Sequence, residues 1–210
     1  MRVPIVRSAA AVVIVGLLLV SLPAAAVART SVDPSTLTPP PPAAFDPVCY
    51  RDGVQTICDI NFSDSAVNDD SGVLCPSATG DLLQSQVRTV SGQRYYDSAG
   101  LLTRRHFHED FVGSFTSADT GLTVQYSGHD TIDHYLSVPG DVTSGDFTVT
   151  GLQTRVYQAP GGTVVMQVGR AVIEEASGNL IGETGKFAFD RYFSGDPTAL
   201  EPLCQALGVG

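Results

Sequence analysis

Apolar and polar residues alternate along most of the chain between residues 82 and 191, a pattern typical of strands that bury one face. Turns that contain glycine interrupt the alternation, and no apolar repeat of helical period occurs in this region. The pattern predicts six long strands, at 82–96, 101–116, 122–135, 146–158, 163–175 and 180–191. Long strands joined in sequence by short turns form an antiparallel meander.

A flat, open meander of this kind would leave two long edges with unpaired backbone groups. Twisting and closing the sheet pairs these groups. We therefore expect an all-β fold in which the antiparallel meander closes into a small β-barrel, and a β-sandwich is the alternative architecture.

A short C-terminal helix is expected after the last strand. Asp196 is a favourable N-cap, and Pro197 suits the first helical position. One face of the helix carries three apolar residues, Leu200, Leu203 and Leu207. Pro202 limits the helix to two short turns, and Gly208 ends it.

The first 28 residues have the composition of a signal peptide. Arg2 and Arg7 precede an apolar run at 9–20, and small residues allow cleavage after Ala28. We therefore expect residues 1–28 to be a signal peptide and the protein to be secreted. The alternative is that the segment stays uncleaved and anchors the chain in a membrane.

The chain after the signal peptide divides into two parts. Residues 29–47 are rich in proline, including four in a row, and predict an extended spacer. Residues 48–210 then form a single β-barrel domain.

Four cysteines follow the signal peptide, Cys49, Cys58, Cys75 and Cys204. Their spacing lacks the close pairs typical of zinc sites, so an even number in an exported chain predicts two disulfides, for which three pairings exist. A turn at Asp52-Gly53 predicts a hairpin in which Cys49 lies opposite Thr56 and diagonal to Cys58. This geometry favours the pairings Cys49–Cys58 and Cys75–Cys204.

Composition and charge restrict the partners. The 210 residues are 43% hydrophobic and 16% charged, which excludes a disordered polymer. Twelve basic residues oppose 22 acidic ones, a net charge of -10, and removal of two arginines with residues 1–28 leaves ten against 22, a net charge of -12. Nucleic acid, which requires a basic surface, is therefore excluded as a partner.

The densest group of ionisable residues is the run from His106 to Asp110. Alternation gives this strand an apolar face of three residues, Phe107, Phe111 and Phe115. If that face is the core face, both histidines of the run point outward, and we expect no metal site and no cofactor. Glu109 shares the core face, where a carboxylate must be paired or border a cavity.

Partners for Glu109 are expected on the next strand, whose inward positions include Asp130 and His134. Two carboxyl groups beside an imidazole could exchange protons, so Glu109, Asp130 and His134 are the candidate catalytic residues. The structural alternatives are a bulge that turns Glu109 outward, or a buried network in which His134 satisfies the carboxylates. A one-residue change of register would separate the three side chains.

Arg155 and Arg170 each lie within an apolar stripe of their strand, and Tyr126 belongs to the inward set of its own strand. In a barrel, inward arginines could pair with Glu109 or Asp130, or could donate hydrogen bonds to an anionic ligand. Arg155, Arg170 and Tyr126 are therefore candidate ligand-binding residues. The alternative is that the arginines extend to a rim and form surface ion pairs.

Several short segments combine turn and strand motifs: QRYYDSAGLLTRR at 93–105, EDFVGSF at 109–115, TG at 120–121, VGR at 168–170 and LCQAL at 203–207. Together they resemble a family of uncharacterised exported actinobacterial β-barrel proteins. The resemblance spans roughly residues 75–207 and implies a secreted β-barrel. It implies no reaction, because no activity is established for that family.

The chain lacks the G-x-S-x-G, H-E-x-x-H, Walker and dinucleotide-binding motifs, which excludes the commonest hydrolases and nucleotide enzymes. Three functions remain. The one we favour is a module that binds a small apolar or amphipathic molecule in a hollow barrel. The others are a non-catalytic cell-envelope or interaction protein with a filled barrel, and a lyase, isomerase or cyclase that acts in the cavity.

Overall fold

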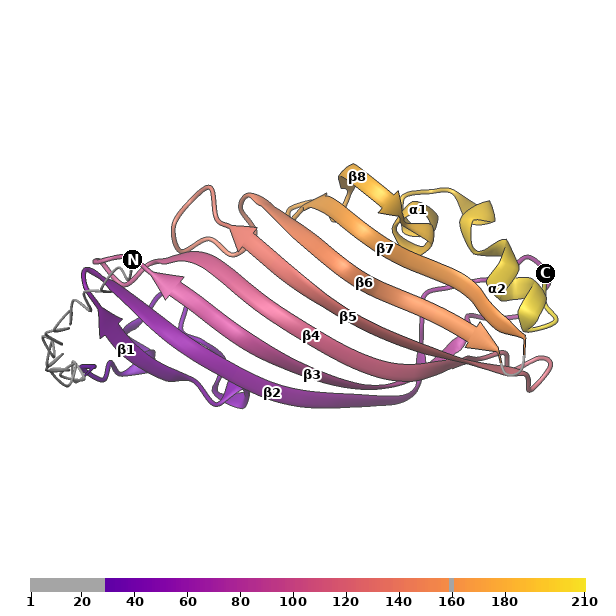
Figure 1. Ribbon diagram of the computed structural model, residues 1–210, viewed down its shortest axis with the longest axis horizontal. Coiled ribbons are helices and arrows are strands. Elements are labelled where there is room, and N and C mark those ends of the chain that lie inside the picture. Colours follow the sequence, from indigo (N-terminus) through magenta and orange to yellow (C-terminus); the bar gives the residue numbers. More distant parts are fainter. Residues whose placement is uncertain (1–28, 159–160) are drawn as a thin grey trace, which may run out of the picture.

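A computed structural model describes residues 29–158 and 161–210, in which eight strands form one antiparallel sheet (Figure 1). Strands that are neighbours in the sheet are neighbours in the chain, so the predicted meander is confirmed. The strands are β1 (Val48–Asp52), β2 (Gln55–Asp70), β3 (Leu83–Tyr96), β4 (Leu102–Thr116), β5 (Thr123–Tyr135), β6 (Asp146–Gln158), β7 (Gly162–Glu174) and β8 (Leu180–Lys186). The predicted signal peptide lies outside the described residues.

All six predicted strands are present, as β3 to β8, and only the last one has a substantially different end. β8 ends at Lys186, and the helix α1 (Ala188–Phe193) follows it. Gln167 on β7 accepts a hydrogen bond from Phe189 N at 2.9 Å, close to the start of α1. This helix thus begins at a tertiary contact, which the local pattern does not show.

The long strand β2 is the main element that the sequence does not predict beyond Cys58. Its second half is rich in Asp, Asn and Ser, which favour turns. It is extended because its backbone pairs with β3 from Thr56 to Asp70, with one irregularity. Strand pairing therefore overrides local preference in this segment.

β1 and β2 form the predicted hairpin with a different turn. The turn residues are Gly53 and Val54, and Asp52 belongs to β1. Gly53 has φ +59°, as the first position of a type II′ turn requires. The shift places Cys49 directly opposite Cys58, not diagonal to it, and the Cys49–Cys58 disulfide forms as predicted.

The sheet does not close, because no hydrogen bonds join β1 to β8. The edge of β1 is covered by the chain that precedes it: Val32 N donates to Cys49 O at 3.0 Å, and Arg51 N donates to Thr30 O at 2.8 Å. β8, at the other edge, has only seven residues. Short or covered edges make closure unnecessary, so the predicted barrel closure is not found.

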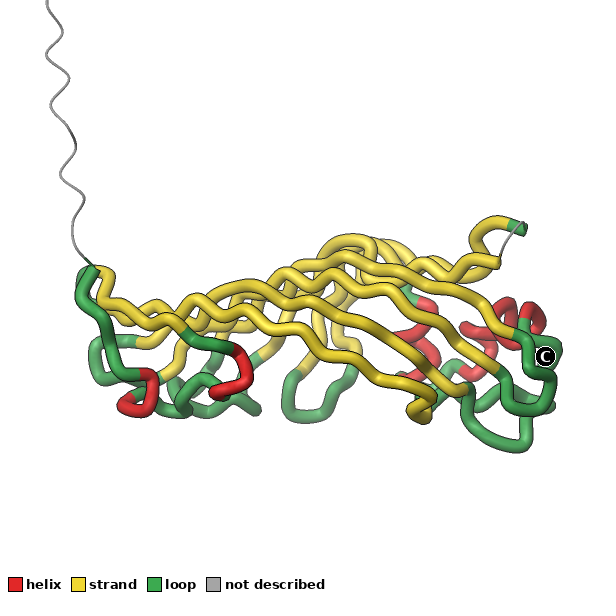
Figure 2. The backbone as a smooth tube through the Cα atoms, turned by 90° about the horizontal axis from the view of Figure 1, so that it is seen from below, coloured by secondary structure: helices red, strands yellow, loops and turns green. Residues whose placement is uncertain are grey.

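The sheet is arched, and the helices lie on one side of it, at its two ends (Figure 2). The 3-10 helices η1 (Pro34–Thr36) and η2 (Ala43–Phe45) lie at one end, and α1, η3 (Pro197–Leu200) and α2 (Glu201–Ala206) lie at the other. We call the side with the helices the concave face and the opposite side the convex face. Among the described residues, no helix has the length and apolar character needed to cross a membrane.

Residues 31–47, within the 29–47 segment that the sequence predicts to be an extended spacer, pack on the concave face and form what we call the amino-terminal strap. The Tyr96 hydroxyl donates to Pro39 O at 3.1 Å. The ring of Phe45 stacks on Phe62 of β2, with centroids 4.3 Å apart. These aromatic contacts make the proline-rich segment part of the domain, which corrects the spacer prediction.

Two apolar cores lie on the concave face, one at each end of the sheet. The amino-terminal core consists of Leu37, Cys49, Cys58, Tyr96, Leu102 and Leu136. The larger carboxy-terminal core includes Leu82, Phe115, Val124, Tyr126, Val156, Phe189, Leu200, Leu203 and Leu207. The middle of the concave face belongs to neither core.

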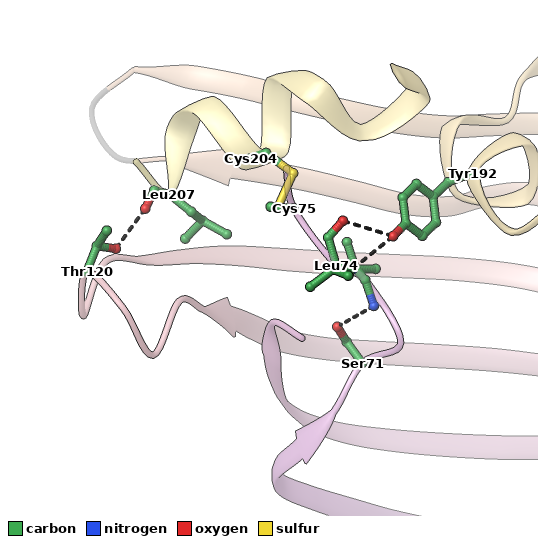
Figure 3. The surroundings of a disulfide bond; sticks show 8 residues. Ser71, Leu74, Cys75, Thr120, Tyr192, Cys204 and Leu207 are labelled. Atoms are coloured by element: carbon green, nitrogen blue, oxygen red, sulfur yellow. Dashed lines mark hydrogen bonds between the residues drawn. A yellow bond between two sulfur atoms is a disulfide. The ribbon is translucent and has the colours of Figure 1, made fainter. Parts of the chain in front are cut away.

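The C-terminal helices cover the carboxy-terminal core as the sequence predicts. Asp196 caps η3 by accepting a hydrogen bond from the backbone N–H two residues later, at 3.1 Å. The predicted Cys75–Cys204 disulfide connects α2 to the segment before β3 (Figure 3). The Thr120 hydroxyl donates to Leu207 O at 2.7 Å, so the β4–β5 turn also holds the end of this helix.

Loss of the Cys75–Cys204 disulfide should destabilise the protein more than loss of the Cys49–Cys58 disulfide. The sequence separations that they close are 129 and 9. The chain-entropy relation predicts decreases in the free energy of unfolding of about 5 and about 3 kcal/mol, respectively, when both cysteines of a pair are replaced by serine. Urea unfolding measures both values, and equal losses would contradict the prediction.

Candidate functional site

A pocket of about 330 Å³ opens on the concave face between the two cores, and we call it the central pocket. Its apolar wall comes from the amino-terminal strap and from β2 to β6 and consists of Phe45, Phe62, Val90, Phe107, Ile132 and Phe147. Its polar wall consists of Arg88, Arg94, Arg105, Glu109, His134 and Glu175. Apolar and charged groups thus meet in one cavity.

Strand alternation explains why these side chains share one face. Arg105, Phe107 and Glu109 occupy every second position of β4. Arg94 on β3 and His134 on β5 are the backbone partners of Arg105 on its two sides. One row across three strands therefore brings two guanidinium groups and an imidazole to the same end of the pocket.

Gly92 makes room in the floor of the pocket. It lies opposite Phe107, and a Cβ at residue 92 would come within 2.9 Å of the Phe107 ring. The ring therefore lies across the glycine. A side chain at this position would push the ring into the pocket.

Glu109 and Asp130 face each other across β4 and β5, as the sequence predicts. Arg88 Nη1 lies 3.7 Å from Glu109 Oε1, whereas Asp130 is only 6% exposed and its Oδ1 has no hydrogen-bond partner. Burial and then the charge of Glu109 raise the pKa of Asp130 to about 7. Burial also raises the pKa of Glu109, against the opposing effect of Arg88. The carboxyl pair therefore retains a proton up to near-neutral pH.

His134 does not join this carboxyl pair. It lies four residues along β5 from Asp130, or about 13 Å at the rise of an extended strand. Its Nε2 donates to Ser144 O at 2.8 Å, which leaves Nδ1 to accept a hydrogen bond from Arg105 Nε at 3.0 Å. Burial, together with the charge of Arg105, lowers the pKa of His134. His134 is a neutral residue that positions Arg105, so the expected three-residue cluster does not assemble.

Arg155 lies on the convex face, where its Nε donates to Thr163 Oγ1 at 2.9 Å. Simple alternation places it on the same side as Phe147. A bulge in β6 between Gly151 and Thr154 shifts the alternation by one residue. Arg155 therefore points away from the pocket, and the expected inward position is corrected.

Arg170 also lies exposed on the convex face. β7 is apolar on both faces, and its buried face carries Val165, Gln167 and Ala171. Alternation alone therefore assigns the wrong row of β7 side chains to the inner face, and the expected inward position of Arg170 is corrected as well.

Tyr126 points inward as expected, but it lies in the carboxy-terminal core and is 2% exposed. Its hydroxyl accepts a hydrogen bond from Gln84 Nε2 at 2.6 Å and donates to Gln86 Oε1 at 2.8 Å. A smaller pocket of about 220 Å³ lies beside it. Tyr126 is thus separate from the central pocket.

The three arginines of the central pocket are the residues that sequence reasoning missed. The alternation that selects Glu109 on β4 also selects Arg105. On β3, Arg88 and Arg94 alternate with Val90 and Gly92 and therefore share their face. The signal was present, but the outer face of β3 carries Leu83, Val87 and Tyr95 and is as apolar as the inner face, so alternation does not identify the inner one.

His106 and His108 lie on the outer face of β4, as predicted. His106 Nδ1 lies 2.9 Å from Asp133 Oδ1, and His108 Nδ1 lies 2.9 Å from Thr131 Oγ1. Within residues 29–158 and 161–210, no group of three or more His, Cys, Asp or Glu side chains could hold a metal ion.

Comparisons of the chain with protein-family models, with curated proteins and with solved structures found no match. What the central pocket can bind is therefore inferred from its own geometry.

Asp130→Asn should change how stability depends on pH. The pKa of Asp130 is about 7 in the folded protein and near 3.8 when unfolded, so the folded state binds more protons between these values. The free energy of unfolding of the native protein should fall as pH rises through this window. The free energy of unfolding of the variant should not show this decrease. Above pH ~7 it should exceed that of the native protein by roughly 2–4 kcal/mol.

Urea unfolding of both proteins at several pH values tests this prediction. Asp70→Asn, which alters an exposed carboxylate at the end of β2, is the matched control. Parallel pH profiles for the Asp130 variant and the native protein would contradict a raised pKa at Asp130.

Proposed function

We propose that the protein binds a small, largely apolar molecule in the central pocket. The observation that supports this most directly is the apolar wall of the pocket, which carries four phenylalanines and is not filled by side chains of the two cores. The pocket volume of about 330 Å³ is about twice that of a cavity that binds benzene, which corresponds to on the order of a dozen non-hydrogen atoms. Concave sites of mixed apolar and polar lining are typical of ligand pockets.

The strap supports the same function. Phe45 of the strap lines the pocket, and its stacking on Phe62 of β2 fixes its position. The pocket is therefore assembled from segments far apart in the chain, and a ligand would contact both the strap and the sheet.

The other two functions have less support. An enzyme that transfers protons between Glu109 and His134 would require the two side chains to meet. His134 is instead hydrogen-bonded to Ser144 and Arg105. An interaction protein that depends on a free proline-rich spacer lacks that spacer, because the strap packs on the sheet.

We also propose that the protein acts outside the cytosol. The two disulfides support this, because such bonds persist in oxidising compartments. Export also fits the predicted signal peptide.

The binding proposal is tested with 1-decanol, an uncharged probe of suitable size, by isothermal titration calorimetry on the full chain. Ile132→Trp should fill the pocket and weaken binding about tenfold or more, because the indole occupies the space of the ligand. Val112→Trp, at a position 60% exposed on the convex face, is the control and should bind as the native protein does.

Native mass spectrometry of protein purified from its own culture medium should detect a retained small molecule, which the Ile132 variant should lack. Absence of decanol binding, or equal binding by the native protein and by the Ile132 variant, would contradict the proposal.

A further inference from the structure

Arg94 is the residue of the central pocket that the fold itself does not explain. It lies within β3, between Cys58 of β2 and Arg105 of β4, and is only 5% exposed. Its side chain lines the central pocket. A guanidinium at such a depth normally has an acidic partner.

The other two arginines of the pocket have such partners. Arg88 Nη2 lies 2.6 Å from Asp64 Oδ2, and its Nη1 also approaches Glu109. Arg105 Nη2 lies 3.1 Å from Glu175 Oε1. The acidic residues of the pocket wall are thus already engaged.

Arg94 has no such partner in the part of the chain that the structure describes. Its Nε is buried without a hydrogen bond, and it takes part in no ion pair. Its nearest aromatic neighbour is Tyr96, whose ring centroid lies 5.8 Å from the Arg94 guanidinium carbon. Burial raises the pKa of Tyr96 to about 12, although the charge of Arg94 and its hydrogen bond to the hydroxyl oppose this shift. The hydroxyl donates to Pro39 O, so this phenol is a neutral partner that supplies no negative charge.

An arginine remains charged even when it is buried, so this cost is not relieved by loss of a proton. Burial lowers the pKa of Arg94, and the charge of Arg105 adds to this effect, while the interaction with Tyr96 opposes it only in part. A buried ion without an opposite charge destabilises the folded protein. An anion that enters the central pocket would remove most of this cost.

The geometry points to Arg94 as the residue that binds the carboxylate of a singly charged amphipathic ligand. The apolar body of this ligand lies against Phe107 and Ile132. This inference rests on the proposed function, since it names the class of molecule that the same pocket takes. A planar guanidinium matches a carboxylate through two parallel hydrogen bonds. Glu109 and Glu175 line the same pocket and disfavour a doubly charged group such as a phosphate monoester.

The test uses three probes with the same ten-carbon chain, decanoate, 1-decanol and decylamine, in calorimetric titrations of the full chain near neutral pH. Decanoate should bind about 10- to 100-fold more tightly than 1-decanol, the range expected for hydrogen bonds to a charged group. Decylamine should bind more weakly than 1-decanol.

Arg94→Met removes the charge and keeps much of the side-chain volume. This variant should bind decanoate no more tightly than 1-decanol, while its affinity for 1-decanol stays within about threefold of the native value. Its urea midpoint should equal or exceed that of the native protein, because an unpaired buried charge has been removed. Arg155→Met on the convex face makes the same charge change and should leave the preference for decanoate intact.

Arg94→Lys keeps the charge without the planar fork, and it should retain a weaker preference for decanoate even if the methionine variant does not fold. Equal binding of decanoate and 1-decanol by the native protein would overturn the inference and leave the proposed function standing. The inference would also be overturned if decylamine bound most tightly of the three probes, or if Arg94→Met kept the preference for decanoate over 1-decanol. If none of the three probes bound, the proposed function would fail first.

Discussion

The structure depends on covering one face of an open sheet. A meander that buries apolar side chains on one side needs a second layer over that side. Here the two ends of the chain supply the layer: the amino-terminal strap covers one end of the concave face, and η3 and α2 cover the other. Each end carries a disulfide, Cys49–Cys58 in the first hairpin and Cys75–Cys204 across the second layer. The central pocket lies between the two covered ends.

The charged residues of the interior follow from this arrangement. A dry core would not tolerate the arginines of β3 and β4, but the border of a pocket does when most of them are paired. His134 fixes Arg105 from one side and Glu175 pairs with it, whereas Arg94 in the same row has no acidic partner among the described residues. Asp130 avoids the same problem below about pH 7 by keeping its proton. An arginine cannot do so, and it is therefore the residue that most requires a ligand.

Part of the site follows from alternation and part does not. Glu109 and Asp130 could be predicted as neighbours because β4 and β5 pair without a bulge along their whole length. Arg155 could not be placed, because the β6 bulge that reverses its direction has no clear mark in the sequence. His134 lies four residues along β5 from Asp130, and its partner Ser144 belongs to a loop held by local hydrogen bonds to Val138 and Asp141. Register and local hydrogen bonds thus decide which of several inward residues meet.

Local periodicity, capping residues and a short hairpin are enough to predict the strands β3 to β8, the C-terminal helix and the two disulfide pairs. That the sheet stays open, and that the proline-rich segment packs on it, follow from tertiary contacts alone. Both outcomes depend on which distant segment covers the concave face. The stabilisation comes from contacts between segments far apart in the chain, and no periodic pattern in the sequence indicates such contacts. The central pocket and its unpaired arginine are the result of that coverage, since they lie where the two covering layers leave the sheet exposed to a ligand.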